Sequence, residues 1–243
     1  QILNIFKRIN KMDLSKDASE ILDILLLTNA YYPELNISKE QFLELKSNWL
    51  IKNSNFQLIE NYLIKNQIIN EHTKLTKLLV DDYLSKSEIK KACEVFSKIK
   101  VSIQDDYLSK FNIYCLINNN KKEEAQLILD LKKELGFEDT FYENKINFLM
   151  GYTNQPNIEV SENTILDFHL SHRTNPKFSF KPKDSTSEQI WKYLSSSNLL
   201  DNINDIELTD IDRIRSVEKA THEKHYEEKE LFELYKRFQF NIN

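Results

Sequence analysis

The strongest constraint on this chain is a pattern of apolar residues that returns every 33 residues between Phe42 and Met150. At this spacing the apolar positions align in five columns: Phe42, Leu75, Leu108 and Phe141; Leu50, Tyr83, Leu116 and Leu149; Ile51, Leu84, Ile117 and Met150; Ile59, Ala92 and Ala125; Leu63, Phe96 and Leu129. The last two columns stand four residues apart, which is helical spacing. Each period therefore predicts a helix, a short polar link and a second helix, the arrangement of stacked helical hairpins.

The composition also favours helices. The 243 residues include 2 Gly and 4 Pro, which are too few for the turns of an all-β fold or for a glycine-rich phosphate loop. With 40% hydrophobic and 29% charged residues, the chain has the composition of a soluble globular protein, and no apolar run is long enough to span a membrane. We predict an all-α solenoid of antiparallel helical hairpins over residues 1–151, followed by a less regular helical extension over 152–243.

The spacing and the capping residues predict where individual helices begin and end. The repeat predicts helices over residues 39–53, 56–68, 71–86, 88–100, 105–118, 121–135 and 139–150. Ser38 and Gln41 match a capping box, and Gly136 suits the end of a helix. Before the repeat we expect a buried helix that starts at Ser15 or Asp17.

After Gly151 the period fails. We expect a helix capped by Ser161, an extended segment over residues 175–186, and a helix opened by Thr186 or Ser187. A last pattern begins at Thr209, and it fits one long helix or two helices broken near Thr221 equally well.

These columns resemble the tetratricopeptide-like superfamily. Its large residue late in the first helix is matched by Leu50, Tyr83 and Leu116, and its small residue early in the second helix by Ala92 and Ala125. The family's first-helix glycine column holds Ser47, Val80 and Ile113 here, and its closing proline column holds Glu71, Gln104 and Phe137. The resemblance implies a right-handed superhelical scaffold whose first helices line a concave face that binds peptides or partner proteins.

The same resemblance implies a binding surface on the first helices of the hairpins. On matching positions this surface contains Gln41, Glu44, Asn48, Lys74, Lys77, Asp81, Tyr107, Lys110 and Tyr114. The lysines suit a peptide carboxylate or an acidic side chain. Trp49 and Tyr114 lie outside the shared apolar columns, and we expect them to be exposed aromatic contacts.

The sequence carries few residues suited to other chemistry. His169 with His172 and His222 with His225 could bind zinc if their helices meet, but solvated or capping histidines are the favoured interpretation. Cys93 and Cys115 are expected to be buried free thiols. We predict a non-catalytic interaction scaffold without metal or cofactor; the alternative is a metal-binding or enzymatic accessory protein that uses the histidine-containing C-terminal region.

Charge and chain ends guide the expected partners. The net charge is -5, and acidic and basic residues are interspersed. We therefore expect a protein or peptide partner. We expect no nucleic acid partner, because a pentatricopeptide-like RNA binder would need a basic groove, and no membrane insertion.

Because the first residue is Gln and the last helical pattern has no stop signal, we expect a segment of a longer protein or a chain trimmed at both ends. Apolar residues of the stretch 231–240 are expected to lie uncovered and to favour self-association through the chain ends. No compartment is predicted.

Overall fold

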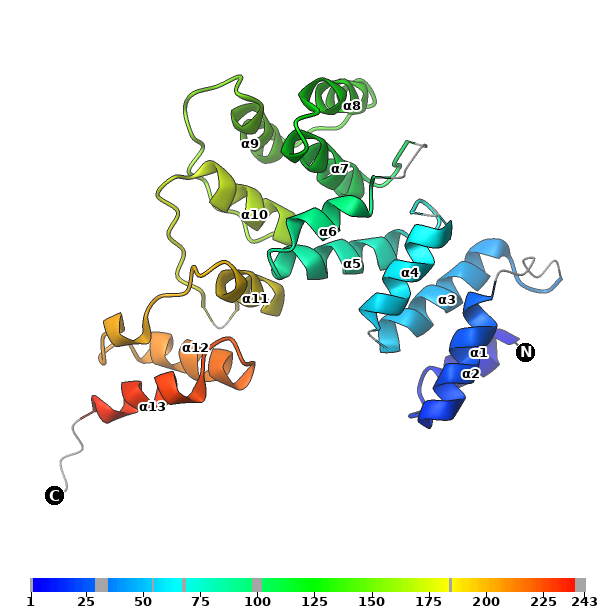
Figure 1. Cartoon of the computed structure of the whole chain (residues 1–243), viewed down its shortest axis with the longest axis horizontal. Helices are drawn as coiled ribbons and strands as arrows, with labels where there is room; N and C mark the ends of the chain where they lie inside the picture. The colour runs from blue at the N-terminus through cyan, green and yellow to red at the C-terminus, as the bar shows by residue number, and fades with distance from the viewer. Residues whose placement is uncertain are drawn as a thin grey trace. The chain divides into compact units, whose positions relative to one another are not determined.

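The computed structural model describes residues 2–28, 35–53, 55–66, 69–97, 102–183 and 185–238. Among these residues the regular elements are all helices and no strand occurs, which confirms the all-α class (Figure 1). The helices are α1 (Ile2–Ile9), α2 (Lys16–Leu27), α3 (Lys39–Asn53), α4 (Phe56–Asn66), α5 (Thr73–Ser85), α6 (Ile89–Glu94), α7 (Asp106–Asn118), α8 (Lys122–Glu134), α9 (Thr140–Met150), α10 (Ile165–Thr174), α11 (Glu188–Ser196), the 3₁₀ helix η1 (Ile203–Asp205), α12 (Ile211–His222) and α13 (Glu228–Lys236).

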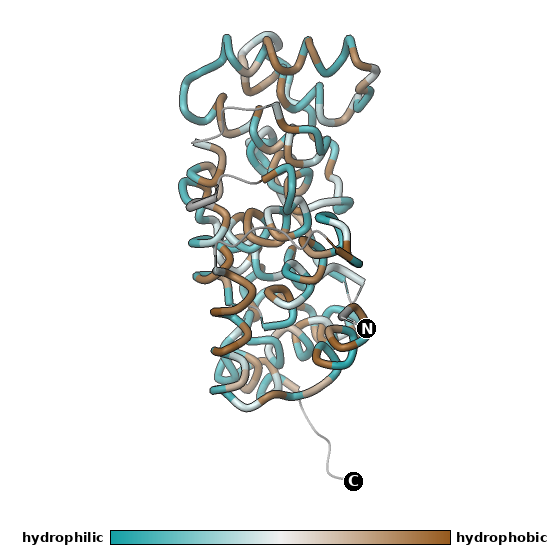
Figure 2. The backbone as a smooth tube through the Cα atoms, turned by 90° about the vertical axis from the view of Figure 1, so that its right-hand side faces the viewer, coloured by the Kyte–Doolittle hydropathy of each residue, from teal (hydrophilic) through white to brown (hydrophobic). Residues whose placement is uncertain are grey.

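Helices α3 to α9 lie within the ranges that the 33-residue period predicts. Hydrophobic and hydrophilic stretches alternate along the backbone tube, as the hydropathy colouring shows (Figure 2). Eight of the column residues are 0% exposed: Leu50, Ile59, Leu75, Leu84, Ala92, Leu108, Ala125 and Leu129. Most of the periodic apolar positions are therefore buried, as amphipathic helices require, and the remaining five, Phe42, Ile51, Leu116, Phe141 and Leu149, are half-buried.

Six helices end in the same way. A residue with left-handed backbone follows the helix, and the next N–H donates to the carbonyl five residues earlier, which satisfies a carbonyl that the helix leaves unpaired. The left-handed residues are Ser87, Asn120, Gly136, Gly151, Asn198 and Lys224, and the closing bonds measure 2.8–3.0 Å. Two of the six are glycines, so most of these six helices stop without the residue that adopts this conformation most readily.

The capping predictions can be compared directly with the structure. Gln41 N–H donates to Ser38 Oγ (3.2 Å) and Ser38 N–H donates to Gln41 Oε1 (3.1 Å), so the predicted capping box is confirmed. Thr164, not Ser161, caps α10, because its Oγ1 accepts from Asp167 N–H at 3.0 Å. Residues 223–227 separate α12 from α13. Of the two alternatives for the last pattern, one long helix or two shorter ones, the structure therefore has two helices.

The chain divides into two compact units. Unit 1 comprises Gln1–Val80 and Lys90–Cys115, and unit 2 comprises Asp81–Ile89 and Leu116–Asn243. The predicted division at residue 151 concerns where the repeat ends and stays a prediction. Among the described residues no helix is both long and apolar enough to cross a membrane.

In unit 1, the expectation that α2 is buried is wrong. Leu26 is its buried residue, whereas Ile21, Ile24 and Leu25 are 58%, 67% and 66% exposed. The apolar residues of α2 run around most of its circumference, and a helix that packs on one side leaves the others open. The expectation that Trp49 is an exposed contact is also wrong. It is 1% exposed, and its Nε1 donates to Asp23 of α2 at 2.7 Å.

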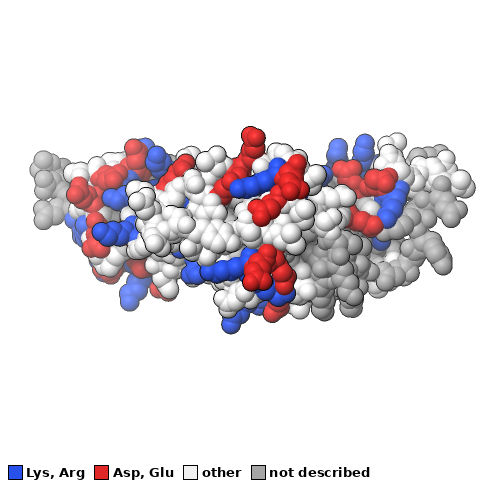
Figure 3. Space-filling view, turned by 90° about the horizontal axis from the view of Figure 1, so that it is seen from above, with Lys and Arg blue, Asp and Glu red and all other residues white. Residues whose placement is uncertain are grey.

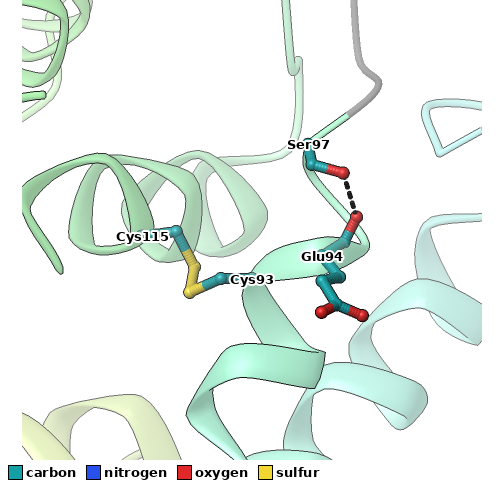
Figure 4. The surroundings of a disulfide bond; sticks show 4 residues. All are labelled: Cys93, Glu94, Ser97 and Cys115. Carbon is teal, nitrogen blue, oxygen red and sulfur yellow. Dashed lines mark hydrogen bonds between the residues drawn. A yellow bond between two sulfur atoms is a disulfide. The ribbon is translucent and has the colours of Figure 1, made fainter. Parts of the chain in front are cut away.

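A disulfide joins Cys93 of α6 to Cys115 of α7 within unit 1 (Figure 4). The expectation of free thiols is therefore wrong. The two cysteines are 22 residues apart in sequence, but their Cα atoms lie 5.3 Å apart, a separation that a disulfide can bridge. The second helix of one period and the first helix of the next are neighbours here, and this proximity cannot be recognised from two isolated cysteines.

In unit 2, basic side chains bond to the carbonyls of irregular segments. Lys145 is fully buried in α9 and donates to the carbonyls of Asn157 and Glu159, both at 2.7 Å. Arg213 is 8% exposed and donates to the carbonyl of Pro182 at 2.8 Å and to Asp201 at 2.8 Å. The loop after α9 and the segment before α11 are thus tied to helices by charge-assisted hydrogen bonds.

The last helix packs on the body of unit 2. Leu234 is 0% exposed and belongs to a buried cluster with Trp191, Ile203, Ile206, Ile214, Val217, Ala220 and Tyr226. Leu231 and Phe238 pack against the same cluster. The expectation that this stripe is uncovered is therefore wrong for these three residues, because α13 turns back after the break at 223–227 and lies against α12 (Figure 1).

We expect the double substitution Cys93→Ala/Cys115→Ala to lower the free energy of unfolding by about 3 kcal/mol, because the disulfide limits the freedom of the unfolded chain over a 22-residue separation. Urea unfolding measures this difference. Reducing agent should destabilise the wild type by a similar amount and leave the variant unchanged. Alkylation of both cysteines in folded, unreduced protein, seen by intact mass, would contradict the assignment.

Candidate functional site

The structure places the predicted surface residues in very different surroundings. Asn48 and Lys74 are exposed, Lys77, Asp81, Tyr107 and Lys110 are half-buried, and Tyr114 is 2% exposed. The expectation that Tyr114 is an exposed contact is therefore wrong. Its chain neighbours Ile113 and Cys115 are also buried, so α7 is covered on several sides at this turn and presents no open face there.

Lys77 makes contacts within unit 1. Its Nζ lies 2.7 Å from Asp105, just before α7, and 5.8 Å from the ring centre of Tyr107. The Tyr107 ring in turn meets Phe111 edge to face, with 6.3 Å between centroids. Lys77 and Tyr107 therefore join α5 to the start of α7. The exposed residues of the predicted surface, such as Asn48 and Lys74, lie outside this contact.

A cavity of about 490 Å³ opens between α3 and the start of α5. Its lining residues come from two segments: Lys39, Glu40, Leu43, Glu44 and Ser47 from α3, and Asn70, Glu71, His72, Thr73 and Lys74 from the turn before α5 and its first residues. Two of them, Glu44 and Lys74, belong to the predicted surface, and their charged groups lie 3.6 Å apart. Lys39 and Glu71 form a second ion pair at 2.5 Å, so charges of both signs line the cavity.

The inner wall of the cavity contains a chain of hydrogen bonds. His72 Nδ1 lies 2.9 Å from Ser47 Oγ, and its Nε2 lies 2.9 Å from the Tyr62 hydroxyl. All three side chains are buried, with His72 only 1% exposed. A neutral imidazole has one N–H donor and one acceptor nitrogen, so it can bond both hydroxyls at once.

Burial also sets the charge of this wall. Desolvation lowers the pKa of His72 to about 4, which makes the ring neutral at pH 7. Lys46 lies close by: it is 7% exposed, and its Nζ lies 5.0 Å from the Phe42 ring centre and 5.7 Å from that of Tyr62. Burial lowers the pKa of Lys46 as well. The cavity thus combines a neutral polar wall with charged lining residues that can bond polar groups of a ligand.

Our sequence reasoning missed Ser47, Tyr62 and His72 as a group. One signal was present: Ser47 is the polar member of a column that holds Val80 and Ile113 in the next periods. A second signal is His72, which stands 33 residues before Asp105. Asp105 caps α7 by accepting from Leu108 N–H at 3.1 Å. His72 occupies the equivalent position before α5, and a histidine there indicates a role other than helix capping.

The two histidine pairs do not combine into one site. In unit 2, Nδ1 of His169 and Nδ1 of His172 both lie 2.8 Å from the Tyr193 hydroxyl, while His225 stacks on Trp191 with ring centroids 6.2 Å apart. Burial lowers the pKa of His169 to about 3. Over the residues that the structure describes, no group of three or more His, Cys, Asp or Glu side chains is arranged to hold a metal ion.

Comparison of the chain with protein-family models, with curated proteins and with solved structures gave no match. Any function proposed for it must therefore come from its own residues and their geometry.

The stability of the protein should fall as the pH drops from 6.5 towards 4, and His72 should contribute to this loss. Its pKa is lower in the folded state than the unfolded value of 6.5, so the unfolded chain binds the proton first; stability from this group is complete above pH 6.5 and lost as the pH falls to about 4. The difference between 6.5 and about 4 corresponds to about 3 kcal/mol.

Urea unfolding of the wild type and of His72→Gln across this pH range measures the effect, because Gln keeps a donor and an acceptor but does not titrate. The variant should lose less stability on acidification than the wild type. His222→Gln, which replaces an exposed histidine, is the matched control and should follow the wild type. Equal pH slopes for the wild type and His72→Gln would contradict the assignment.

Proposed function

We propose that this chain is a non-catalytic, tetratricopeptide-like helical-repeat scaffold that binds a peptide segment of a partner protein in the cavity between α3 and α5. The cavity itself is the observation that supports this function. It lies on the first helices of two successive periods, where the family resemblance puts the binding surface, and it contains the predicted residues Glu44 and Lys74. No cofactor or nucleic acid takes part in this proposal.

The chemistry of the cavity suits a peptide with both polar and charged groups. Glu44 and Lys74 are 59% and 65% exposed at their side chains and 3.6 Å apart, so this pair is weak in water and can exchange its internal partner for a ligand group. Ser47 on the inner wall can bond a backbone amide or carbonyl group through its hydroxyl, whereas both ring nitrogens of His72 are already bonded to Ser47 and Tyr62. Charges of both signs line the cavity, and acidic and basic side chains are also interspersed among the described residues visible in Figure 3, which suits a peptide better than a nucleic acid backbone.

Binding of peptides selected from a random display library tests this proposal. Glu44→Lys and Lys74→Glu should each weaken binding of the selected peptides by roughly tenfold or more, because each replaces an attractive charge on the cavity lining by a repulsive one. Fluorescence anisotropy measures affinity, and melting temperature verifies folding. Lys90→Glu, an exposed position of unit 1 outside the cavity, is the control. Selected peptides that bind both cavity variants as tightly as the wild type would contradict this location.

An enzymatic role is the competing interpretation of the Ser47 and His72 pair, because a serine hydroxyl within hydrogen-bond reach of an imidazole is the core of a nucleophile site. Two observations disfavour it. With a pKa of about 4, His72 is a poor base at neutral pH. Its second neighbour is the Tyr62 hydroxyl, which cannot stabilise an imidazolium as a carboxylate does.

We therefore expect Ser47 to remain unlabelled by a fluorophosphonate probe that derivatises activated serines. Peptide mapping by mass spectrometry after incubation at neutral pH measures this, with a known serine hydrolase as the positive control. Labelling of Ser47 that disappears in His72→Gln would identify an activated nucleophile and overturn the non-catalytic assignment.

A further inference from the structure

Helix α8 in unit 2 carries a row of exposed leucines that packing within the unit does not use. Leu127, Leu131 and Leu135 are 62%, 51% and 84% exposed and stand four residues apart, so they lie on one side of the helix and of its C-terminal cap. The opposite side is the buried one, since Ala125 and Leu129 are 0% exposed. The helix thus has two apolar sides, and only one of them is covered.

Acidic side chains lie along one edge of this leucine row. Asp130 and Glu134 are exposed, four residues apart, and occupy the adjacent row. Gln126, one turn earlier in that row, donates to Asp130 at 2.7 Å. On the other side of the leucines, Ile128 and Lys132 are half-buried. A partner that covers the leucines therefore meets exposed acidic side chains on one edge, and the half-buried Ile128 and Lys132 on the other.

We propose that α8 docks an amphipathic helix of a partner protein whose apolar stripe covers Leu127, Leu131 and Leu135 and whose adjacent edge carries Lys or Arg. A helix that lies along another helix contacts it through residues at such spacing. The acidic edge selects the charge of the partner. This surface is independent of the cavity between α3 and α5, because it involves other residues and another unit.

The same charges disfavour two other occupants. In an antiparallel two-fold pair of α8 helices, the edge with Asp130 and Glu134 of one copy faces the same edge of the other copy, so like charges oppose each other. An anionic membrane surface attracts helices with basic edges, and α8 has an acidic one. A basic amphipathic helix has neither disadvantage.

A displayed library of amphipathic helices with a constant leucine stripe and randomised edge positions tests the proposal on the full chain. Selection should enrich Lys and Arg along one edge. Affinity of the selected helices, measured as purified peptides by anisotropy, should fall at least tenfold for Leu127→Ser/Leu131→Ser. The double charge reversal Asp130→Lys/Glu134→Lys should weaken basic-edged peptides by a similar factor and improve binding of acidic-edged ones.

Phe232→Ser, which replaces another exposed apolar residue of unit 2, is the matched control and should bind like the wild type. Melting temperature verifies that the leucine variant is folded. The proposal is overturned if selection shows no preference for basic edges or if the leucine variant binds as tightly as the wild type. It is also overturned if the leucines are needed for a dimer of the chain in ultracentrifugation, or for binding to anionic phospholipid vesicles, rather than for peptide binding.

Discussion

The irregular segments of unit 2 depend on one constraint: a backbone carbonyl taken out of water must find a donor. Lys145 donates hydrogen bonds to two carbonyls of the loop after α9, and Arg213 donates to the carbonyl of Pro182. Arg237 does the same for Ile203 and Ile206 around η1, at 3.1 and 2.8 Å. A buried acceptor without a partner costs about 1–3 kcal/mol, so these basic side chains contribute to fixing the loops, and they fix the last helix together with the apolar cluster around Leu234.

This constraint explains why the fold was predictable in one region and not in the other. Helices α3 to α9 follow from the apolar period and from local caps such as Ser38 with Gln41, because both signals act over a few residues. The bonds of Lys145 and Arg213 join residues 12 to 31 positions apart, and no pattern in the sequence marks them. The errors at Trp49, Tyr114 and the two cysteines have the same origin, since burial and proximity depend on which helices become neighbours.

The candidate site shows the same division. Glu44 and Lys74 could be identified from their places on successive first helices. The wall behind them could not, because Ser47 and Tyr62 meet through His72, which is 25 and 10 residues away from them. A buried imidazole between two hydroxyls is recognisable only when the three elements that carry them are in place. Its neutrality follows from this enclosure, so the electrostatic character of the cavity is a property of the packed structure.

The common ending of six helices affects how this fold can change over evolutionary time. Ser87, Asn120, Asn198 and Lys224 show that the left-handed position accepts several residue types here, at a penalty of about 1–2 kcal/mol for non-glycine residues. The stop is held by the N–H that follows and by the carbonyl five residues before it, both of which belong to the backbone. Descendants of this chain can therefore exchange the residues at these stops and keep the helices, and distant relatives would share the distances between stops more than the amino acids that occupy them.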